Sequence, residues 1–299
     1  MTVRFTIVPR GPFSLRAAAG FGFGPSTGAP KPAGDLMRLA FPVDGFEEHA
    51  GVVLRQDADG VVHGQLHGAH ELEPARRQVA RILSLDHDGE AWAAVGERDP
   101  VIGRLQAAHP GLRPVLFHSP YEAAAWSIIS ARRPARQAAE VRRELSEALG
   151  ASFELAGERV AAFPLPEQLL EVQPMRGLPE EKCERLRGAA QAALEGRLDP
   201  ERLGAMEPEA AMAEMRTLKG IGPFYAGLIV VRATGLTDVL PVEEPKSLRA
   251  AAHFYGLDRT PDPAAFAGLA EPWRPFRTWA VVLLRVAGDR AARPDQDAA

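Results

Sequence analysis

Two patterns of hydrophobic and polar positions divide the chain. Residues 1 to about 75 carry short runs of alternating or β-branched residues, VRFTIVP near the start and GVVLRQDADGVVHGQLHG further on. Runs of this kind predict half-buried strands, and the DADG at residues 57–60 predicts a hairpin turn between two of them. The glycine- and proline-rich residues 20–34 predict a loop. The pattern therefore indicates an antiparallel, β-rich N-terminal region.

Beyond this region the pattern is helical almost to the end of the chain. Ser119 offers an N-cap, Pro120 fits the first helical position, and Glu122 completes a capping box. This helix is predicted to continue through Ala131, to break or kink at Pro134 and to resume until about residue 149. Further helices are predicted over residues 165–172, 180–194, 208–217, 223–234 and 273–288, and a disordered tail over 293–299.

Composition restricts the class of protein. A single cysteine, Cys183, excludes an intramolecular disulfide and a four-cysteine zinc or iron–sulfur site. No run approaches the roughly 20 apolar residues of a membrane helix, and no signal-peptide pattern opens the chain, so we expect a cytoplasmic protein. The net charge of −4 argues against coating nucleic acid by bulk electrostatics but permits a local grip on a few phosphates.

Such a local grip is predicted between two of the helices, in the sequence LKGIGPFYA at residues 218–226. Gly220 and Gly222 can adopt backbone angles that other residues cannot, and they let another backbone come close. Ile221 between them can anchor the turn in the core. The second helix then starts at Pro223 with its free N–H groups pointing outward, which suits a phosphate. The alternative is an ordinary helical corner with a glycine C-cap, because a lone G-x-G is weak evidence.

Together with the residues that follow it, this hairpin resembles that of the helix-hairpin-helix DNA glycosylases, most closely their 3-methyladenine DNA glycosylase II branch. The family places an arginine in the second helix, here Arg232, and then a D-V-F-P-like loop, here DVLPVEE at residues 238–244. Further family-like landmarks occur in the right order: residues 99–102 (DPVI), 109–113 (HPGLR), 119–139, 177–182 (GLPEEK) and 271–280 (EPWRPFRTWA).

The resemblance implies an α+β, mostly α fold: an N-terminal antiparallel β-rich domain with linking helices over residues 1–112, then an all-helical glycosylase core containing the hairpin over 113–292. It implies a monomeric DNA repair glycosylase of base excision repair, associated with the nucleoid. Such an enzyme flips a damaged base, an alkylated purine by this resemblance, out of duplex DNA and hydrolyses its N-glycosidic bond. No cofactor is required.

The catalytic carboxylate implied by the resemblance lies 24 residues after Gly220, at Glu244, where the family has aspartate. Glu243 is the second candidate. Such a carboxylate stabilises the oxocarbenium-like sugar or aims a water at it. Without the resemblance, the two glutamates would be a solvated acidic pair or an N-cap for the next helix.

Further site residues follow from the resemblance. Lys219, Gly220, Ile221 and Gly222 would bind DNA, as would Arg132 and Arg133 in a five-arginine patch completed by Arg136, Arg142 and Arg143; the alternative for the patch is a solvated helix face. Base-pocket candidates are Trp126, Phe224, Tyr225 and Trp273. The backbone carbonyls of Arg216, Leu218 and Gly220 are candidates for holding Na⁺ or K⁺.

Two other functions stay open. The chain can be a non-catalytic protein that binds damaged DNA and has lost the aspartate, or a glycosylase-like enzyme acting on another nucleoside. Among glycosylases, a monofunctional enzyme is favoured, because Phe224-Tyr225-Ala226 stand where bifunctional relatives carry their Schiff-base lysine.

Overall fold

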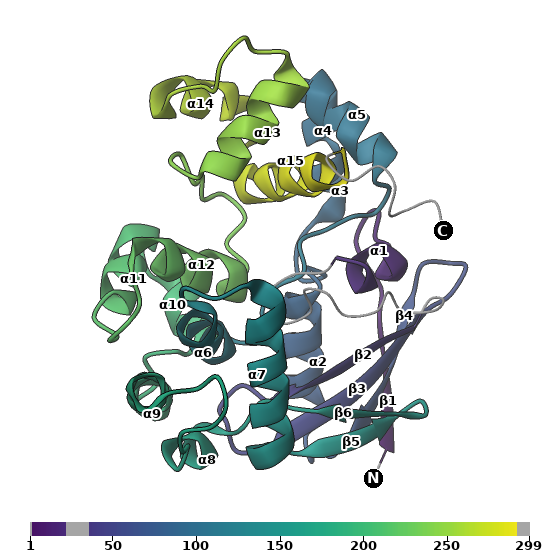
Figure 1. Ribbon diagram of the computed structural model, residues 1–299. Coiled ribbons are helices and arrows are strands. Elements are labelled where there is room, and N and C mark those ends of the chain that lie inside the picture. The colour runs from purple at the N-terminus through teal and green to yellow at the C-terminus, as the bar shows by residue number, and fades with distance from the viewer. Residues whose placement is uncertain (1, 22–35, 292–299) are drawn as a thin grey trace.

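The structure is a computed structural model that describes residues 2–21 and 36–291. Its fold is α+β and mostly α, as predicted, with a four-stranded antiparallel sheet and a two-stranded one below and beside several layers of helices (Figure 1). Most of the predicted loop at 20–34 and the predicted tail at 293–299 lie outside the described residues. Within the described ranges, no helix is both long and apolar enough to span a bilayer.

The N-terminal sheet has the strand order β1-β4-β3-β2, formed by β1 (Thr2–Ile7), β2 (Leu36–Pro42), β3 (His49–Gln56) and β4 (Val62–His67). The predicted turn at 57–60 joins β3 to β4, and Asp57 Oδ1 accepts from the backbone N–H groups of Asp59 and Val61 at 3.0 and 2.9 Å. Alternation puts Phe5 and Ile7 of β1 into the core against α2 (Leu72–Ile82), whereas Arg4 and Thr6 face outward. The short α1 (Leu15–Ala19) packs beside β2.

A second hairpin, which the sequence pattern did not predict, packs on this sheet. It consists of β5 (Ser152–Leu155) and β6 (Glu158–Ala161), which pair antiparallel. The ring of Phe153 lies so close to Gly51 that a Cβ there would approach it to 2.6 Å. Glycine on β3 thus permits the close approach, and Leu155 completes a small core with Leu36 and Val53.

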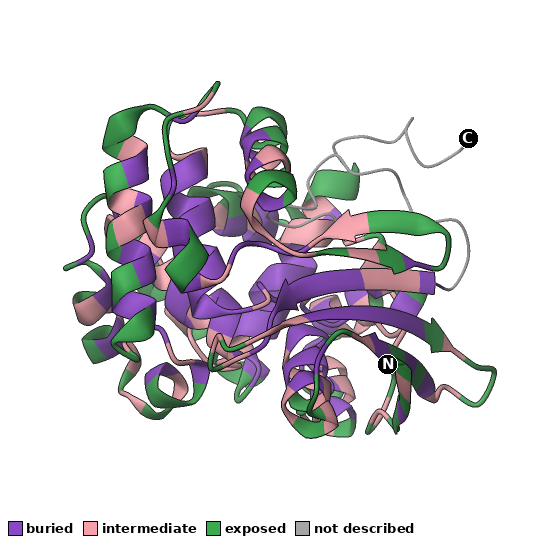
Figure 2. Cartoon of the chain, turned by 90° about the horizontal axis from the view of Figure 1, so that it is seen from below, coloured by how far each residue is buried: buried purple, intermediate pink, exposed green. Residues whose placement is uncertain are grey.

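The central helices form a second core, in which residues 120–129 of α6 are all buried. Figure 2 shows that buried residues gather between the helices and against the sheet. These helices are α6 (Pro120–Ser130), α7 (Ala135–Leu149), α8 (Pro166–Leu170), α9 (Glu180–Leu194), α10 (Pro200–Ala205), α11 (Pro208–Met215) and α12 (Pro223–Thr234). The bounds predicted for α9 and α12 are confirmed. Proline at the first position of α12 and glycine after its end account for the clear bounds of that helix.

The predicted break between α6 and α7 is also confirmed. Arg132 has a φ of +56° there, a left-handed conformation that is uncommon for a residue with a side chain. The ammonium of Lys182 holds the end of α6 by donating to the carbonyls of Ile129 and Ala131 at 2.8 and 3.0 Å. Burial, together with Arg133 and Arg185, lowers the pKa of Lys182 to about 8.

The predicted capping box of α6 is only half correct. Ser119 Oγ accepts from the N–H of Glu122 at 3.2 Å, as expected of an N-cap. The Glu122 carboxylate does not return to the Ser119 backbone. It is buried and bonds the ring of His118 at 3.1 Å and the guanidinium of Arg142 at 2.5 Å. An ion pair satisfies a buried carboxylate better than one backbone N–H does, so the charged partners prevail.

A third core combines two segments that are far apart in the sequence. The helices α3 (Gly89–Ala93), α4 (Val95–Arg98) and α5 (Pro100–Ala108) pack with α13 (Pro245–Tyr255), α14 (Pro263–Leu269), the 3₁₀ turn η2 (Glu271–Trp273) and α15 (Arg277–Ala291). Besides the small core at Leu155, the described residues thus form three larger cores, and residues 89–112 join the C-terminal helices instead of the sheet. The last helix, predicted from Trp273, begins at Arg277 because Arg274 precedes a proline and is extended.

Candidate active site and DNA interface

The glycine hairpin joins α11 to α12 as the sequence predicts. Leu218 and Ile221 are buried and anchor the turn, and the Ile221 N–H donates to the Leu218 carbonyl at 3.0 Å. Gly220 has a φ of +94°, where a side chain would be strained, and a Cβ there would approach Arg185 to 2.8 Å. Gly222 is extended and is the N-cap of α12. A Cβ on Gly222 would meet nothing within 4 Å, so this glycine leaves space for something outside the protein.

The hairpin also leaves polar backbone groups unpaired. Over the described ranges, the amides of Gly220, Gly222 and Phe224 find no backbone acceptor, and the carbonyls of Arg216 and Gly220 accept no backbone hydrogen bond. Lys219 beside them is exposed and lies 3.3 Å from Glu184. The turn therefore presents N–H donors and a cationic side chain toward solvent.

The turn between α6 and α7 adjoins this hairpin. Ser130 Oγ at the end of α6 lies 3.4 Å from the hydroxyl of Tyr225 on α12, which brings two predicted DNA-binding segments together. Arg132 is exposed at the turn. Arg133 is half-buried and donates to the Gly177 carbonyl, which leaves less of its charge for a ligand.

The predicted five-arginine patch is smaller than the sequence suggests. Arg142 is directed into the core, where it binds Glu122 and lies over the Phe163 ring at 5.5 Å. Arg143 pairs with Glu147 at 2.8 Å. The prediction of a continuous patch is therefore wrong. The periodicity of α7 directs Arg142 and Arg143 toward the carboxylates of Glu122 and Glu147. Arg132, Arg133 and Arg136 remain as candidates.

Glu244 is the N-cap of α13, at the end of the connection from α12. Its Oε2 accepts from the N–H of Ser247 at 3.0 Å and also from the Ser247 hydroxyl. The carboxylate is only 13% exposed, and its Oε1 lies 3.6 Å from Nη1 of Arg285 on α15. Glu243 is exposed, and no ion pair is present for it among the described residues. Both predictions for Glu244, a capping role and a reactive carboxylate, are compatible with this geometry, since Oε1 is not taken by Ser247.

Arg285 lies beside this carboxylate, and a second arginine, Arg232, is close enough to Arg285 to be affected by its charge. Arg232, the family-matched arginine on α12, is buried, donates to the Val115 carbonyl at 2.7 Å and lies over the Phe21 ring at 5.6 Å. Burial, and then the positive charge of Arg285, lower the pKa of Arg232 to about 9. The sequence analysis missed Arg285 and Ser247. Ser247, three residues after the glutamate, fits a capping pattern, whereas Arg285 carries no local signal because it is 41 residues away.

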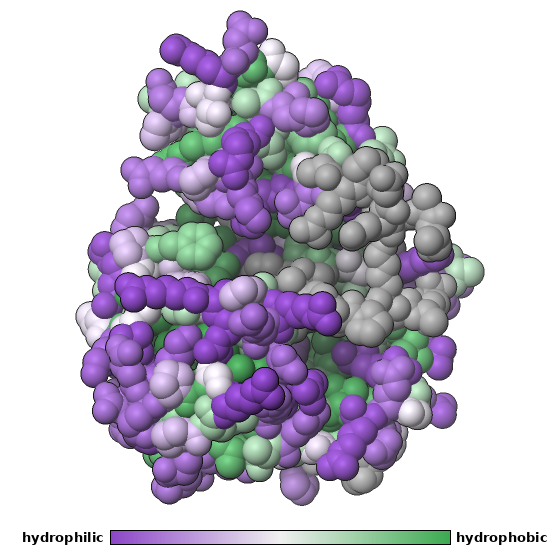
Figure 3. Space-filling view, viewed as in Figure 1, coloured by the Kyte–Doolittle hydropathy of each residue, from purple (hydrophilic) through white to green (hydrophobic). Residues whose placement is uncertain are grey.

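The connection of residues 235–244 runs between two groups of helices, α6–α12 below and α13–α15 above (Figure 1). In the space-filling view the surface is hollowed between these groups (Figure 3). Glu244 starts the upper group and the hairpin starts α12 in the lower one.

The four aromatic pocket candidates have different environments. Phe224 is 63% exposed, and its ring lies 5.4 Å from that of the half-buried Tyr225. Trp126 is buried in the central core. Trp273 is fully enclosed in the third core, where its Nε1 donates to Asp99 at 2.8 Å. The prediction of Trp273 as a pocket wall is wrong for this structure. Its indole N–H is bonded to Asp99 and its ring is packed inside the core, so neither is open to a ligand.

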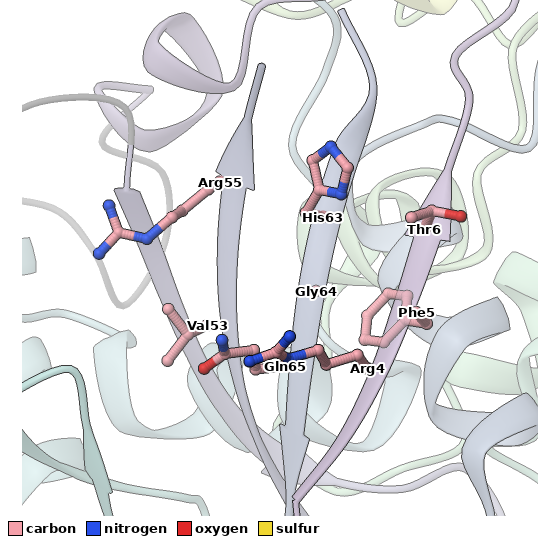
Figure 4. Close-up of a pocket in the computed structure, with 8 residues that line it drawn as sticks. All are labelled: Arg4, Phe5, Thr6, Val53, Arg55, His63, Gly64 and Gln65. Atoms are coloured by element: carbon pink, nitrogen blue, oxygen red, sulfur yellow. The ribbon is translucent and has the colours of Figure 1, made fainter.

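An open depression of about 560 Å³ lies elsewhere, on the outer face of the N-terminal sheet (Figure 4). Arg4, Arg55, His63 and Gln65 project from it, and no carboxylate lines it. It lacks the group that glycosidic hydrolysis needs. Across residues 2–21 and 36–291, no cluster of three or more His, Cys, Asp or Glu side chains is arranged to hold a metal ion.

Known proteins share this fold. No family model matches the chain. A 3-methyladenine DNA glycosylase from Archaeoglobus fulgidus superposes with a TM-score of 0.73 at 21% identity, over 96% of this chain and 98% of that one. In sequence, DNA-3-methyladenine glycosylase 2 of Escherichia coli is 29% identical over 199 residues, 65% of this chain and 66% of the relative. DNA-3-methyladenine glycosylase of Bacillus subtilis is 22% identical over 206 residues, 68% of each.

The chain shares its fold with a solved 3-methyladenine DNA glycosylase and is similar in sequence to curated 3-methyladenine DNA glycosylases, as the resemblance of its motifs predicts. The matched segments span about two thirds of the two sequence relatives.

Proposed function

We propose that this protein is a DNA glycosylase that removes alkylated or otherwise damaged bases from duplex DNA. Glu244 carries this proposal: it is a largely buried carboxylate at the start of α13, and its Oε1 accepts no hydrogen bond from Ser247. The relatives in sequence bear the name DNA-3-methyladenine glycosylase, which supports the same reaction class.

The carboxylate supplies the chemistry that breaking a glycosidic bond needs. Positive charge develops on the sugar as the bond to the base lengthens, and an ionised carboxylate stabilises that charge. It can also orient the attacking water and accept its proton. Ser247 fixes the rotamer of Glu244 through Oε2, so Oε1 is held toward the reacting atoms without further cost in side-chain entropy.

The hairpin and the α6–α7 turn would hold the DNA. The amides of Gly220 and Gly222, with the first turn of α12 behind them, suit a backbone phosphate. Arg132 and Arg133 would add contacts at the adjacent turn. Phe224, exposed at the start of α12, is the best-placed of the predicted aromatic residues to touch an extruded base.

We expect hydrolysis without strand cleavage. The first turn of α12 has Phe224-Tyr225-Ala226 and no lysine. The ammonium of Lys182 donates hydrogen bonds to the carbonyls at the end of α6. A Schiff-base nucleophile needs a free amine facing the sugar. Borohydride trapping of a protein–DNA adduct on a damaged duplex is expected to give none, and a trapped adduct would show lyase activity.

We also propose that the hairpin holds a monovalent cation, as the resemblance implies. The carbonyls of Arg216 and Gly220 accept no backbone hydrogen bond in the described part of the chain, and oxygen donors are what Na⁺ and K⁺ need. These two carbonyls, with that of Leu218, would hold the ion. It would neutralise part of a phosphate's charge.

The test of the proposed function is release of a base from duplexes that carry single alkylated or deaminated bases. We expect wild type to release at least one of them and Glu244→Gln to lose that release. The second candidate function, a binding protein without catalysis, is favoured if both proteins bind a damaged duplex and neither releases a base.

Replacement of Gly222 is expected to weaken DNA binding about tenfold, or ~1.4 kcal/mol. A Gly222→Val side chain meets nothing in the protein, so the fold tolerates it, yet it occupies the space in which a phosphate would approach the amides. Fluorescence anisotropy with a duplex measures the affinity. Gly268→Val on α14, where the added side chain also meets open space, is the control. Unchanged affinity of folded Gly222→Val would contradict the assigned phosphate site.

Salt dependence provides an independent measure of the interface. A small arginine cluster and one hairpin predict a log–log slope of roughly −3 to −5, at about −0.9 per neutralised phosphate. The Arg132→Glu/Arg133→Glu pair is expected to make the slope shallower. Arg143→Glu, which replaces an arginine already paired with Glu147, is the control and should leave the slope unchanged. A wild-type slope near zero would exclude DNA as the partner.

A further inference from the structure

We propose that Asp238 and Arg277 are positioning residues for Glu244. They fix the connection between α12 and α13 to the start of α15, and so they set where the carboxylate lies relative to the glycine hairpin. The inference rests on the proposed glycosylase function and adds a requirement to it. The carboxylate must be held in a fixed position relative to DNA that a different group of helices binds.

The carboxylate of Asp238 lies between two arginines at the start of α15. Its Oδ1 accepts from Nε of Arg277 at 2.7 Å, and its Oδ2 accepts from Nη2 of Arg277 at 3.1 Å and from Nη1 of Arg274 at 2.8 Å. Nη2 of Arg277 also donates to the Asp238 carbonyl at 2.8 Å. Two parallel hydrogen bonds to one carboxylate fix its orientation better than a single ion pair does. One guanidinium therefore holds both the side chain and the backbone of Asp238.

The residues on either side of Asp238 are bound to the same helix. The N–H of Thr278 donates to the Thr237 carbonyl at 2.8 Å. The buried hydroxyl of Thr278 donates to the Val239 carbonyl and accepts from the Val239 N–H, both at 2.9 Å. The first N–H groups of a helix have no partner within it, so the connection supplies acceptors that α15 lacks. Residues 237–239 are thus held as part of the start of α15.

This clamp of Asp238 and Arg277 lies directly after the point where the chain crosses from one core to another. Leu236 packs against the central core that contains α12, whereas Leu240 packs against the third core. The crossing therefore falls between Leu236 and the clamped segment 237–239. On the far side, Glu244 starts α13, which packs on the same α15 that carries the clamp. The clamp thus joins the carboxylate to the hairpin's group of helices with almost no intervening free chain.

Loss of the clamp would turn residues 237–243 into a flexible link. The helices α13–α15 would stay attached through their packing on α5 and the segment that leads from α5 to α6, so the carboxylate would be displaced and not lost. Displacement of a reacting group by about 1 Å can lower a rate by about 10²-fold. The hairpin lies on the other side of the crossing, so the affinity for DNA should not change.

The experiment compares single-turnover base release and duplex affinity in wild type and Asp238→Asn, on the duplex that wild type processes fastest. We expect the rate to fall about 10- to 100-fold, while the Kd for the same duplex stays within about twofold of wild type. Glu214→Gln is the matched control. Its carboxylate also lies between two arginines, Arg197 and Arg202, but it belongs to the central helices, so its loss should leave the rate unchanged.

A double-mutant cycle separates positioning of the carboxylate from general structural support. If Asp238 acts through Glu244, Asp238→Asn should add little to the loss that Glu244→Gln already causes. A residue that only supported the fold would lower the residual rate in the Glu244→Gln background as much as in wild type. That additive result would overturn the inference.

Thr278→Val decides the matter if Asp238→Asn does not fold. This variant removes the two hydroxyl hydrogen bonds to Val239 and should show the same loss of rate without loss of affinity, at a smaller size. An unchanged rate in the folded variant, or equal losses of rate and affinity, would overturn the inference while base release by wild type upholds the proposed function. Release of no base by wild type would overturn both.

Discussion

Glu244→Gln is expected to lower single-turnover base release by about 10² to 10³-fold. The glutamine keeps an acceptor for Ser247, so the start of α13 is retained and the loss reports on the charge. Rates are measured on the duplex that wild type processes fastest. Glu243→Gln, an exposed neighbour, is the control and should change the rate little. A large loss in Glu243→Gln with none in Glu244→Gln would move the catalytic assignment by one residue.

Shortening the same side chain distinguishes two uses of the glutamate. If Glu244 only replaces the family aspartate, Glu244→Asp should retain or raise the rate. We expect a loss of about 10- to 100-fold instead, because Ser247 and Arg285 are placed around the longer side chain and a displaced carboxylate stabilises the sugar less well.

The second large effect is on stability. Glu122→Gln is expected to lower the free energy of unfolding by about 3 to 5 kcal/mol. The carboxylate is 2% exposed between His118 and Arg142, so the neutral variant leaves Arg142 buried without its counter-charge. Chemical denaturation measures the loss. Glu147→Gln, whose carboxylate is exposed and pairs with Arg143, is the control and should fall within about 0.5 kcal/mol of wild type.

Glu122 also predicts a pH dependence. Burial alone would raise the pKa of its carboxyl, but His118 and Arg142 together lower it from 4.5 to about 2. A lowered pKa means that the unfolded state binds the proton more readily. The stabilisation is therefore complete above pH 4.5 and is lost as the pH falls toward 2. Wild type should lose more stability than Glu122→Gln over this interval, and equal losses would contradict the assignment.

Local signals explain what could be predicted from the sequence. The bounds of α12 follow from Pro223 at its start and Gly235 after its end. The hairpin follows from Gly220 and Gly222, two glycines that stand between two helical patterns. The count from Gly220 to Glu244 finds a carboxylate that lies, largely buried, at the N-cap of α13 and beside Arg285. Each of these features depends on residues close together in the chain or on one motif spacing.

The failures involve contacts between distant residues. Trp273 matched a family landmark, but its indole N–H binds Asp99, which is 174 positions away, so it belongs to the core. Glu122 fitted a capping box, yet Arg142 one helix further on attracts its carboxylate. Arg285 meets Glu244 only because α13 packs on α15. Packing of this kind has no periodic signature in the sequence.

The third core has a consequence for how the chain folds as it is made. Residues around Trp92, Ile102 and Leu105 find their apolar partners on α13–α15, which are synthesised much later. The sheet and α2 can pack during synthesis because their contacts are close together in the sequence. The apolar partners of these three side chains, in contrast, are synthesised some 150 residues later. During that interval they expose an apolar surface, so this segment is where a nascent chain would most need a chaperone.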